Sequence, residues 1–224
     1  IYQWDVLTRA RAIENGLLKI NVINIRDYAE GKHKQCDDMP FGGGAGMVLK
    51  PEPIFRALEI LDKNCVIYTT PQGKKFDQED AKKFAKMEEI TIIAGHYEGV
   101  DERVVEKLVT HEVSLGDFVL TGGELAAMVI SDAVSRLIPG VLGNSSSYEN
   151  DSFYNGVLDH PHYTRPAEFM GMKVPDVLMS GHHKNIEKWR RKESLRRTIE
   201  RRPELIKTVE LTKEDKKLLK EIEN

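Results

Sequence analysis

Apolar residues along the chain gather into short runs that alternate with amphipathic stretches. Three runs, Cys65–Thr69, Ile90–Ala94 and Glu112–Leu115, are rich in β-branched residues and end at a turn signal. This pattern is typical of buried parallel strands. Between the first two runs, Asp77–Met87 carries apolar residues at helical spacing. We therefore expect a strand–helix–strand unit in a parallel sheet, with the right-handed crossover that such units adopt.

Other stretches extend this α/β pattern. Pro51 and Pro53 mark the start of a helix, and Asn21–Ile25 is a further strand candidate. Gly122–Ile138 has the spacing of a long helix that stops before Pro139. Its residues expected to face the core are Leu125, Met128, Val129, Ala133 and Leu137.

The last third of the chain has a different composition. Asn144–Asn155 is rich in Ser, Asn and Tyr without a hydrophobic period, which favours an inter-domain linker. From Asp159 onward we expect mainly helix, with one helix near Asn185–Arg201 and another near Lys213–Glu223. The predicted organisation is an α/β domain over residues 1–142, a linker over 143–158 and a helical domain over 159–224.

Composition narrows the class of protein. The 224 residues are 40% hydrophobic and 31% charged, as in a soluble globular protein, and the apolar run around Met128–Ile130 is too short to cross a bilayer. Cys36 and Cys65 stand in unrelated contexts, so neither a disulfide framework nor a zinc cluster is indicated. We expect a cytoplasmic protein without a membrane partner.

The charge distribution changes this picture in one place. The net charge of −3 argues against a nucleic-acid partner, yet Lys184–Arg202 carries nine basic and three acidic residues. Screening limits charge effects to about 10 Å at ordinary salt, so this local positive surface can bind phosphates. A solvated helix face is the alternative interpretation.

Three segments follow the three predicted strands: the first loop Thr70–Gly73, the second loop Gly95–Gly99 and the third loop Ser114–Glu124. Ligands bind outside the carboxyl ends of strands in α/β sheets, so these loops predict a pocket. No Gly-x-Gly-x-x-Gly signature follows a strand, which disfavours a dinucleotide site. The glycine-dense segment Asp38–Met47 lacks the lysine of a phosphate loop, and it is equally compatible with substrate contact and with a flexible surface loop.

Several segments together resemble the bacterial tRNA (guanine-N1)-methyltransferases, in order and with consistent spacing from about Arg11 to beyond Leu205. They are Asp38–Met47, Gly95–Arg103, Ser114–Glu124, Ser135–Gly143, His162–Pro166 and Val174–Gly181 followed by Trp189. The resemblance implies a SPOUT-class fold, in which an α/β parallel sheet is tied in a deep trefoil knot and a small all-α C-terminal domain follows. It also implies S-adenosylmethionine as methyl donor, tRNA as partner, a linked Mg²⁺ requirement and a homodimer whose active site draws on both chains.

The resemblance also implies the site residues. Those of the methyl-donor pocket are Tyr68, Thr69, Thr70, Pro71, Gly73, Gly95, Tyr97, Glu98, Gly99, Ser114, Leu115, Gly116, Asp117, Phe118, Val119, Leu120, Gly122 and Gly123. Those expected to contact tRNA are Gly46, His162 and Arg165. Glu98 could face the sulfonium or a magnesium ion, but no residue spacing indicates a metal site. His160 and His162 flank Pro161, where packing or RNA contact is favoured over metal binding.

The expected reaction is methylation of N1 of the guanosine immediately 3′ of the anticodon. N1 carries a proton, so the chemistry needs a base there and a positive group near O6, where negative charge gathers. The resemblance assigns Asp151 as the base and Arg136 as the positive partner. From the residues alone, Asp151 could be a turn former and Arg136 a favourable charge at a helix C-terminus.

Three departures from the family pattern and three rival functions complete the prediction. His96 stands where arginine is usual, Ala126 replaces a customary proline, and Ile1–Ala10 does not match the family's opening strand, which we expect to be missing from this chain. The rivals are a SPOUT enzyme acting on rRNA or another tRNA position, a non-catalytic RNA-binding protein, and a phosphotransferase built on Gly42–Gly46.

Overall fold

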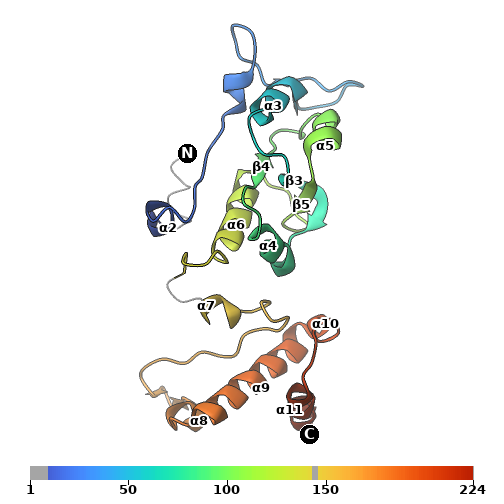
Figure 1. The fold of residues 1–224 in the computed structure, drawn as a ribbon. Helices are drawn as coiled ribbons and strands as arrows, with labels where there is room; N and C mark the ends of the chain where they lie inside the picture. The colour runs from blue at the N-terminus through green and yellow to red at the C-terminus, as the bar shows by residue number, and fades with distance from the viewer. Residues whose placement is uncertain (1–9, 143–145, 224) are drawn as a thin grey trace. The chain divides into compact units, whose positions relative to one another are not determined.

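In the computed structural model, residues 10–142 and 146–223 are described, so the segment 1–9 that was compared with the family's opening strand lies outside them. The chain divides into two compact units, residues 1–143 and 144–224 (Figure 1). The first unit is mixed α/β and the second is built mainly from helices.

A three-stranded parallel sheet forms the centre of the first unit. The strands β3 (Val66–Lys75), β4 (Thr91–Ala94) and β5 (His111–Ser114) pair in the order β4-β3-β5. All three predicted strands are therefore confirmed, as is the parallel sheet. Residues Thr70–Gly73, predicted as a loop, lie instead within β3, where the pairing with β5 shifts register between Thr69 and Lys74.

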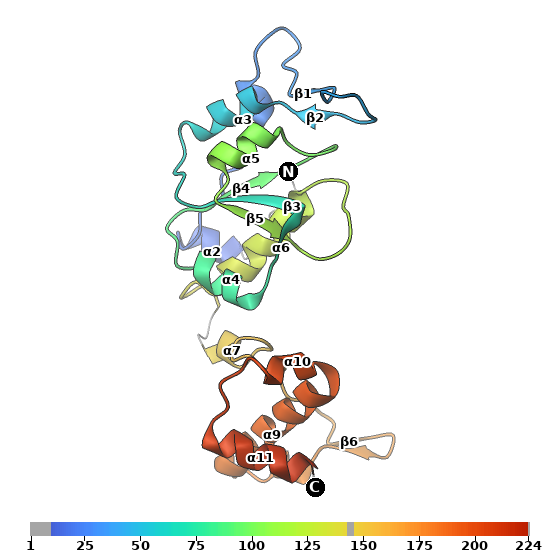
Figure 2. The same cartoon turned by 90° about the vertical axis from the view of Figure 1, so that its right-hand side faces the viewer.

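The remaining elements of the first unit cover the sheet or lead into it. They are α2 (Ala10–Glu14), η1 (Ile25–Tyr28), β1 (Asp37–Asp38), β2 (Val48–Leu49), α3 (Pro51–Leu58), α4 (Gln78–Phe84), α5 (Glu102–Leu108) and α6 (Glu124–Ser135). Helices α3 and α5 lie on one face of the sheet, and α4 and α6 lie on the other (Figure 2). The strand candidate Asn21–Ile25 is wrong, because Asn24 instead caps the 3-10 helix η1 with its side chain.

Alternation along β3 divides the core between the two faces. Val66 and Tyr68 pack into the cluster under α3 and α5, together with Ile54, Ala57, Leu58 and Val104. Successive side chains of a strand point to opposite faces, so the fully buried Ile67 belongs to the face covered by α4 and α6. Helix α4 begins with a capping box between Asp77 and Asp80, a local signal that defines its start.

The predicted inner face of α6 is only partly correct. Leu137 is buried, but Leu125 and Val129 are 51% and 48% exposed. The buried positions of the helix are instead Ala126, Ala127, Ile130, Val134 and Ser135. Because α6 is apolar on more than one side, hydrophobic spacing alone could not select the face that packs on the sheet.

The second unit contains α7 (Ser146–Glu149), β6 (Glu168–Phe169), β7 (Met172–Lys173), α8 (Asp176–Met179), α9 (His183–Arg201), α10 (Pro203–Ile206) and α11 (Lys213–Glu223). The two long helices confirm the predicted ones, but the antiparallel β6–β7 pair shows that this unit is not all-α. Its core joins Val157, Leu195 and Leu218. Within the described residues, no helix combines the length and apolar composition that crossing a membrane requires.

Candidate active site

The carboxyl end of β4 and the second loop meet β3 at the side chain of Tyr68. A Cβ atom added to Gly95 would lie 3.0 Å from Tyr68 Cε2, and one added to Gly99 would lie 3.1 Å from its hydroxyl oxygen. Tyr68 is 8% exposed, and burial raises the pKa of its phenol. The second loop therefore approaches β3 so closely that two of its positions have little room for a side chain.

The third loop joins the same edge through Gly123. Its amide donates a 2.7 Å hydrogen bond to the carbonyl of Gly95. A Cβ at Gly123 would overlap Thr69 Oγ1 and stand 2.8 Å from the nitrogen of Gly95. His96 and Gly122 form an antiparallel bridge beside this contact. Thr69 of β3, the second loop and the start of α6 are thus in direct contact, as expected for loops at one edge of a parallel sheet.

The first loop is held against β5 rather than projecting freely. A Cβ at Gly73 would lie on the peptide between Glu112 and Val113, so β3 passes β5 at this point without space for a side chain. Lys75 carries the strand onward, and its Nζ lies 3.2 Å from Asp117 Oδ2 in the third loop. The first and third loops are therefore also neighbours.

The glycine-dense segment reaches the second loop. The amide of Glu98 donates to the carbonyl of Met47 at 3.0 Å, and the amide of Leu49 donates to the carbonyl of Gly99 at 2.9 Å. Gly46 has φ +89°, and a Cβ there would overlap the Glu98 side chain. This contact places the predicted substrate residue Gly46 beside the predicted donor-pocket residue Glu98. Of the two interpretations of Asp38–Met47, it favours the one in which the segment belongs to the site.

Several side chains around these loops are apolar or aromatic and exposed. Tyr97 is 55% exposed, Phe118 56%, Val119 82% and Leu120 38%. Ser114, by contrast, is buried, and its hydroxyl donates to the carbonyl of Gly116 at 3.1 Å. The site thus combines close-packed glycine backbone with accessible ring and aliphatic surfaces, which suits a ligand that has both polar and flat apolar parts.

The two predicted catalytic residues belong to different units. Arg136 caps the C-terminus of α6, and its amide donates to the carbonyl of Asp132 at 3.2 Å. Asp151 follows α7, and its amide donates to the carbonyl of Tyr148 at 3.2 Å. Both side chains are partly buried. The local structure of each residue is therefore a helix end or turn, as the residue types by themselves suggested.

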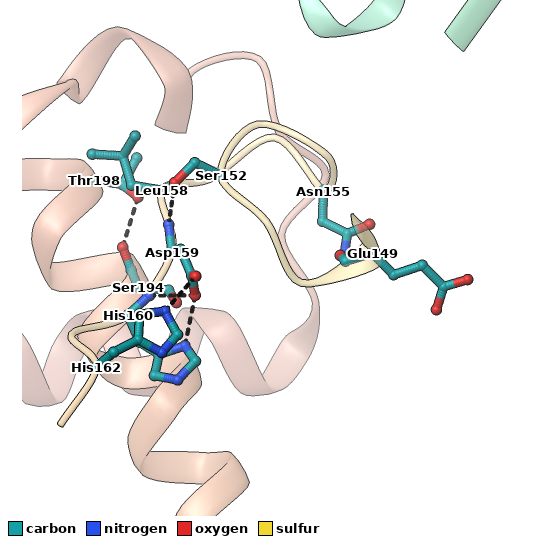
Figure 3. A network of polar contacts seen from close by, with 9 residues as sticks. All are labelled: Glu149, Ser152, Asn155, Leu158, Asp159, His160, His162, Ser194 and Thr198. Carbon is teal, nitrogen blue, oxygen red and sulfur yellow. Dashed lines mark hydrogen bonds and ion pairs between the residues drawn. The ribbon is translucent and has the colours of Figure 1, made fainter. Parts of the chain in front are cut away.

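Asp159 links the two histidines of the second unit (Figure 3). Its Oδ1 lies 2.7 Å from His160 Nδ1, and its Oδ2 lies 2.8 Å from His162 Nε2. Burial raises the pKa of this carboxyl, but hydrogen bonds from His162 and the His160 amide outweigh it and lower the pKa overall. Burial also lowers the pKa of His160. Ligating atoms of the three residues lie within 4.8 Å of one another, although the two nitrogen–oxygen contacts already account for that geometry.

Asp159 is not among the site residues predicted from the sequence. The one local feature that could have indicated it is its position one residue before His160 and three residues before His162. Leu158, the residue before it, donates through its amide to Thr198 Oγ1 of α9 at 3.0 Å, and Thr198 Oγ1 donates to the carbonyl of Ser194 at 2.6 Å. This fully buried threonine holds Leu158, and with it the start of the segment 158–162, against α9. Leu158 and Thr198 are forty residues apart in the chain, so no local sequence pattern predicts their contact.

Comparison with known proteins identifies the family. The family profile described as tRNA (Guanine-1)-methyltransferase TrmD matches residues 3–208. A tRNA (guanine-N(1)-)-methyltransferase of Fusobacterium nucleatum is 67% identical over 213 residues, covering 95% of this chain and 89% of that protein. Proteins of the same description from Desulforamulus reducens and Bacillus cereus are 60% identical over 220 residues and 57% identical over 217 residues. They cover 96% and 95% of this chain, and 87% and 89% of their own lengths.

The match spans both compact units, including the three strand-end loops and the segment that carries Asp159. The chain therefore belongs to the tRNA (guanine-N1)-methyltransferase family, enzymes that methylate guanine in tRNA at N1.

Proposed function

We propose that this enzyme transfers a methyl group to N1 of the guanosine immediately 3′ of the anticodon, within a SPOUT-type knotted fold. Family membership implies tRNA guanine as the substrate and S-adenosylmethionine as the methyl donor. The observation that carries the proposal is the convergence of the second and third loops on Tyr68 and Thr69 of β3, where Gly123 is hydrogen-bonded to Gly95.

The residues at this edge fit S-adenosylmethionine. Glycine at positions 95, 99, 122 and 123 lets these backbone segments approach one another closely, while Tyr97, Phe118 and Leu120 offer surfaces for an adenine ring. We assign donor binding to the full set of eighteen loop residues named from the sequence. When bound, the donor supplies an electrophilic methyl group, and the glycine contacts hold the loops that would surround it.

Asp151 acts as the base in this proposal. Its carboxylate takes the proton from guanine N1, although a carboxylate is a weak base for this purpose. Arg136 compensates, because a guanidinium beside O6 stabilises the negative charge that remains on the base when the proton leaves. Holding the nucleophilic N1 in line with the donor supplies the rest of the acceleration.

The two units divide the work. We assign donor binding to residues 1–142 and tRNA binding to residues 159–224, joined by the segment 143–158 that carries Asp151. We further propose that the enzyme works in the cytoplasm as a homodimer and that Arg136 and Asp151 of one active site come from different chains.

We expect the enzyme to require Mg²⁺, on the ground of its family alone. Among the described residues, the one group of three potential ligands is Asp159, His160 and His162, and imidazole nitrogens suit Mg²⁺ poorly. No step of the reaction is therefore assigned to the ion. Loss of methyl transfer on addition of EDTA, with recovery on added Mg²⁺, is the outcome expected if the family requirement holds here.

Methyl transfer from labelled S-adenosylmethionine to an unmodified tRNA transcript tests the proposed reaction. We expect one methyl group at the guanosine 3′ of the anticodon, and no transfer when that guanosine is replaced by adenosine. Asp151→Asn is expected to slow single-turnover transfer about 10²- to 10⁴-fold, while Glu149→Gln, an exposed neighbour that removes the same charge, leaves it near wild type. A methyl group mapped elsewhere, or full turnover by Asp151→Asn, would refute the assignment.

Mixed dimers test the shared site. When chains carrying Asp151→Asn are coexpressed with chains carrying Arg136→Ala, each mixed dimer keeps one intact site if the two residues come from different chains. Activity should then return to about half of wild type per mixed dimer, although both homodimers are inactive. Mixed dimers that form but stay inactive would show that both residues act within one chain.

A further inference from the structure

We infer that a second pocket, in the second unit beside α9, binds one nucleotide of the RNA substrate, with its phosphate on Arg165 and Arg190 and its base against Tyr163 and an apolar floor. The cavity measures about 410 Å³ and is lined by residues 160–165, Ala167, Val174, Leu178, Met179, Ile186 and Arg190. This volume lies within the range of small-ligand sites. The inference rests on the proposed function, because it takes tRNA as the ligand.

The charge of this pocket favours an anion. Its lining contains two arginines and no carboxylate. Both guanidinium-bearing residues are exposed, and neither forms an ion pair with any residue that the structure describes. The nearby Asp159 carboxylate contacts His160 and His162 and forms no ion pair with either arginine (Figure 3). Arginine suits a phosphate here because its planar donors can bind two oxygens at once.

Arg190 differs in this respect from its neighbours on α9. Four other basic residues of the helix are engaged in ion pairs: Lys188 and Lys192 with Glu221, Arg191 with Asp215, and Arg196 with Glu193. Three of these basic residues form ion pairs with α11, and the fourth, Arg196, forms one within α9. The basic residues of the segment Lys184–Arg202 therefore fall into two groups. Some form internal ion pairs, and others, such as Arg190, are able to bind a ligand.

The walls of the pocket supply stacking surfaces. Tyr163 is 49% exposed, and its ring centroid lies 6.4 Å from that of Trp189. His160 stands edge-on to the same indole at 6.5 Å and lies 4.5 Å from His162. Bases of unpaired nucleotides stack on such rings, and this contact contributes affinity whichever base is present. Rings beside arginines therefore match a nucleotide better than a simple inorganic anion.

A row of arginines along α9, which begins at the pocket and continues beyond it, favours RNA over a free nucleotide as the ligand. Arg190, Arg197 and Arg201 lie on one side of α9, because steps of seven and four residues return to nearly the same helix face. At 1.5 Å per residue they are spaced by about 10 Å and about 6 Å along the helix. Arg197 and Arg201 also form no ion pair with the described residues. Such a row suits a polyanion that continues beyond the pocket.

Equilibrium binding of unmodified tRNA to the full chain tests this pocket. Arg190→Ala is expected to weaken tRNA binding about ten- to a hundredfold, the value of a lost charge-assisted hydrogen bond, and to lower the salt dependence by about one phosphate contact. Arg196→Ala is the matched control, since it removes the same side chain of the same helix from an internal ion pair. Binding of S-adenosylmethionine, measured by calorimetry, should be unchanged in both variants.

Stacking is tested separately at Tyr163. Tyr163→Phe should keep tRNA affinity within about twofold, and Tyr163→Ala should weaken it about tenfold, because only the alanine variant removes the ring on which a base stacks. In a Trp4→Phe background, Trp189 is the only tryptophan of the chain, so quenching of its fluorescence by tRNA or by GMP reports occupancy of the neighbouring pocket.

The outcomes separate the pocket from the proposed function. If the wild-type enzyme methylates tRNA but Arg190→Ala and Arg196→Ala bind tRNA equally well, the pocket proposal is refuted while the function stands. If the wild-type chain binds no tRNA, both fail together. Quenching by GMP that tRNA cannot displace would assign the pocket to a free nucleotide and overturn the RNA proposal.

Discussion

Asp215 stands at the start of α11, and replacing it by Asn should weaken the second unit by an amount that depends on pH. Its side chain is 3% exposed and accepts two hydrogen bonds from Arg191, at 2.7 and 2.9 Å. It also accepts from the amide of Thr212 at 3.0 Å, while Thr212 Oγ1 accepts from the amide of Asp215 at 3.0 Å. Asp215→Asn keeps the size of the side chain and removes its charge.

The pKa of Asp215 gives the expected magnitude. The hydrogen bonds from Arg191 lower it from 3.8 to about 2, against the opposing effect of burial. At 1.36 kcal/mol per pKa unit, the difference amounts to about 2.4 kcal/mol of stability at neutral pH. Because the pKa of Asp215 is lower in the folded state, its contribution to stability is present in full above the unfolded-state pKa. This contribution is lost as the pH falls toward 2. At pH 3 the contribution is therefore about 1.3 kcal/mol.

Urea unfolding followed by Trp189 fluorescence, in the Trp4→Phe background, measures this effect within the second unit. Asp215→Asn should lower the free energy of unfolding by about 2.4 kcal/mol at pH 7 and by about half as much at pH 3. Glu200→Gln, which removes the same charge from an exposed position of α9, should change it by less than about 0.5 kcal/mol. A loss that is equal at both pH values would refute the reasoning, because it would show that ionisation of Asp215 does not contribute.

Three further predictions concern closely packed or buried groups. Gly123→Ala places a Cβ on Thr69 Oγ1, so it should lower the free energy of unfolding of the first unit by about 1–3 kcal/mol in urea titrations; unchanged stability would mean that the loops separate easily. Burial raises the pKa of the thiols of Cys36 and Cys65, which are 4% and 1% exposed, so Ellman's reagent at pH 7.5 should label both only after denaturation. Burial lowers the pKa of the His160 imidazole, so an NMR titration should place its midpoint below 6.5, and a midpoint above 6.5 would contradict the packing described.

Local pattern was sufficient where the determining interactions are themselves local. The three β-branched runs became strands, and Asp77 with Asp80 marked the start of α4 because a capping box joins residues only three apart. A shared edge for the strand ends followed as a consequence of parallel pairing, whereas the order β4-β3-β5 came from the structure. The composition of Lys184–Arg202 likewise indicated a basic helix, and α9 spans most of it.

Packing decided what these patterns left open. Asn21–Ile25 has the residues of a strand, but it is not assigned to one, because a strand requires a partner and none of the described strands pairs with it. Helix α6 is apolar on two sides, and contact with the sheet selected Ala127 and Ile130 over Leu125 and Val129. In both cases, the deciding neighbour lies far away in the sequence.

The same distinction applies to the sites. The sequence by itself predicted which segments lie at the sheet edge, and the family's motifs indicated the chemistry that we propose for them. Only the tertiary structure placed Gly46 against Glu98 and separated Arg190, which faces a pocket, from Arg191, which is bound to Asp215. Arg190 and Arg191 are adjacent in the chain and chemically identical. What distinguishes them is the direction of each side chain around the helix, which places a carboxylate beside one and a pocket beside the other.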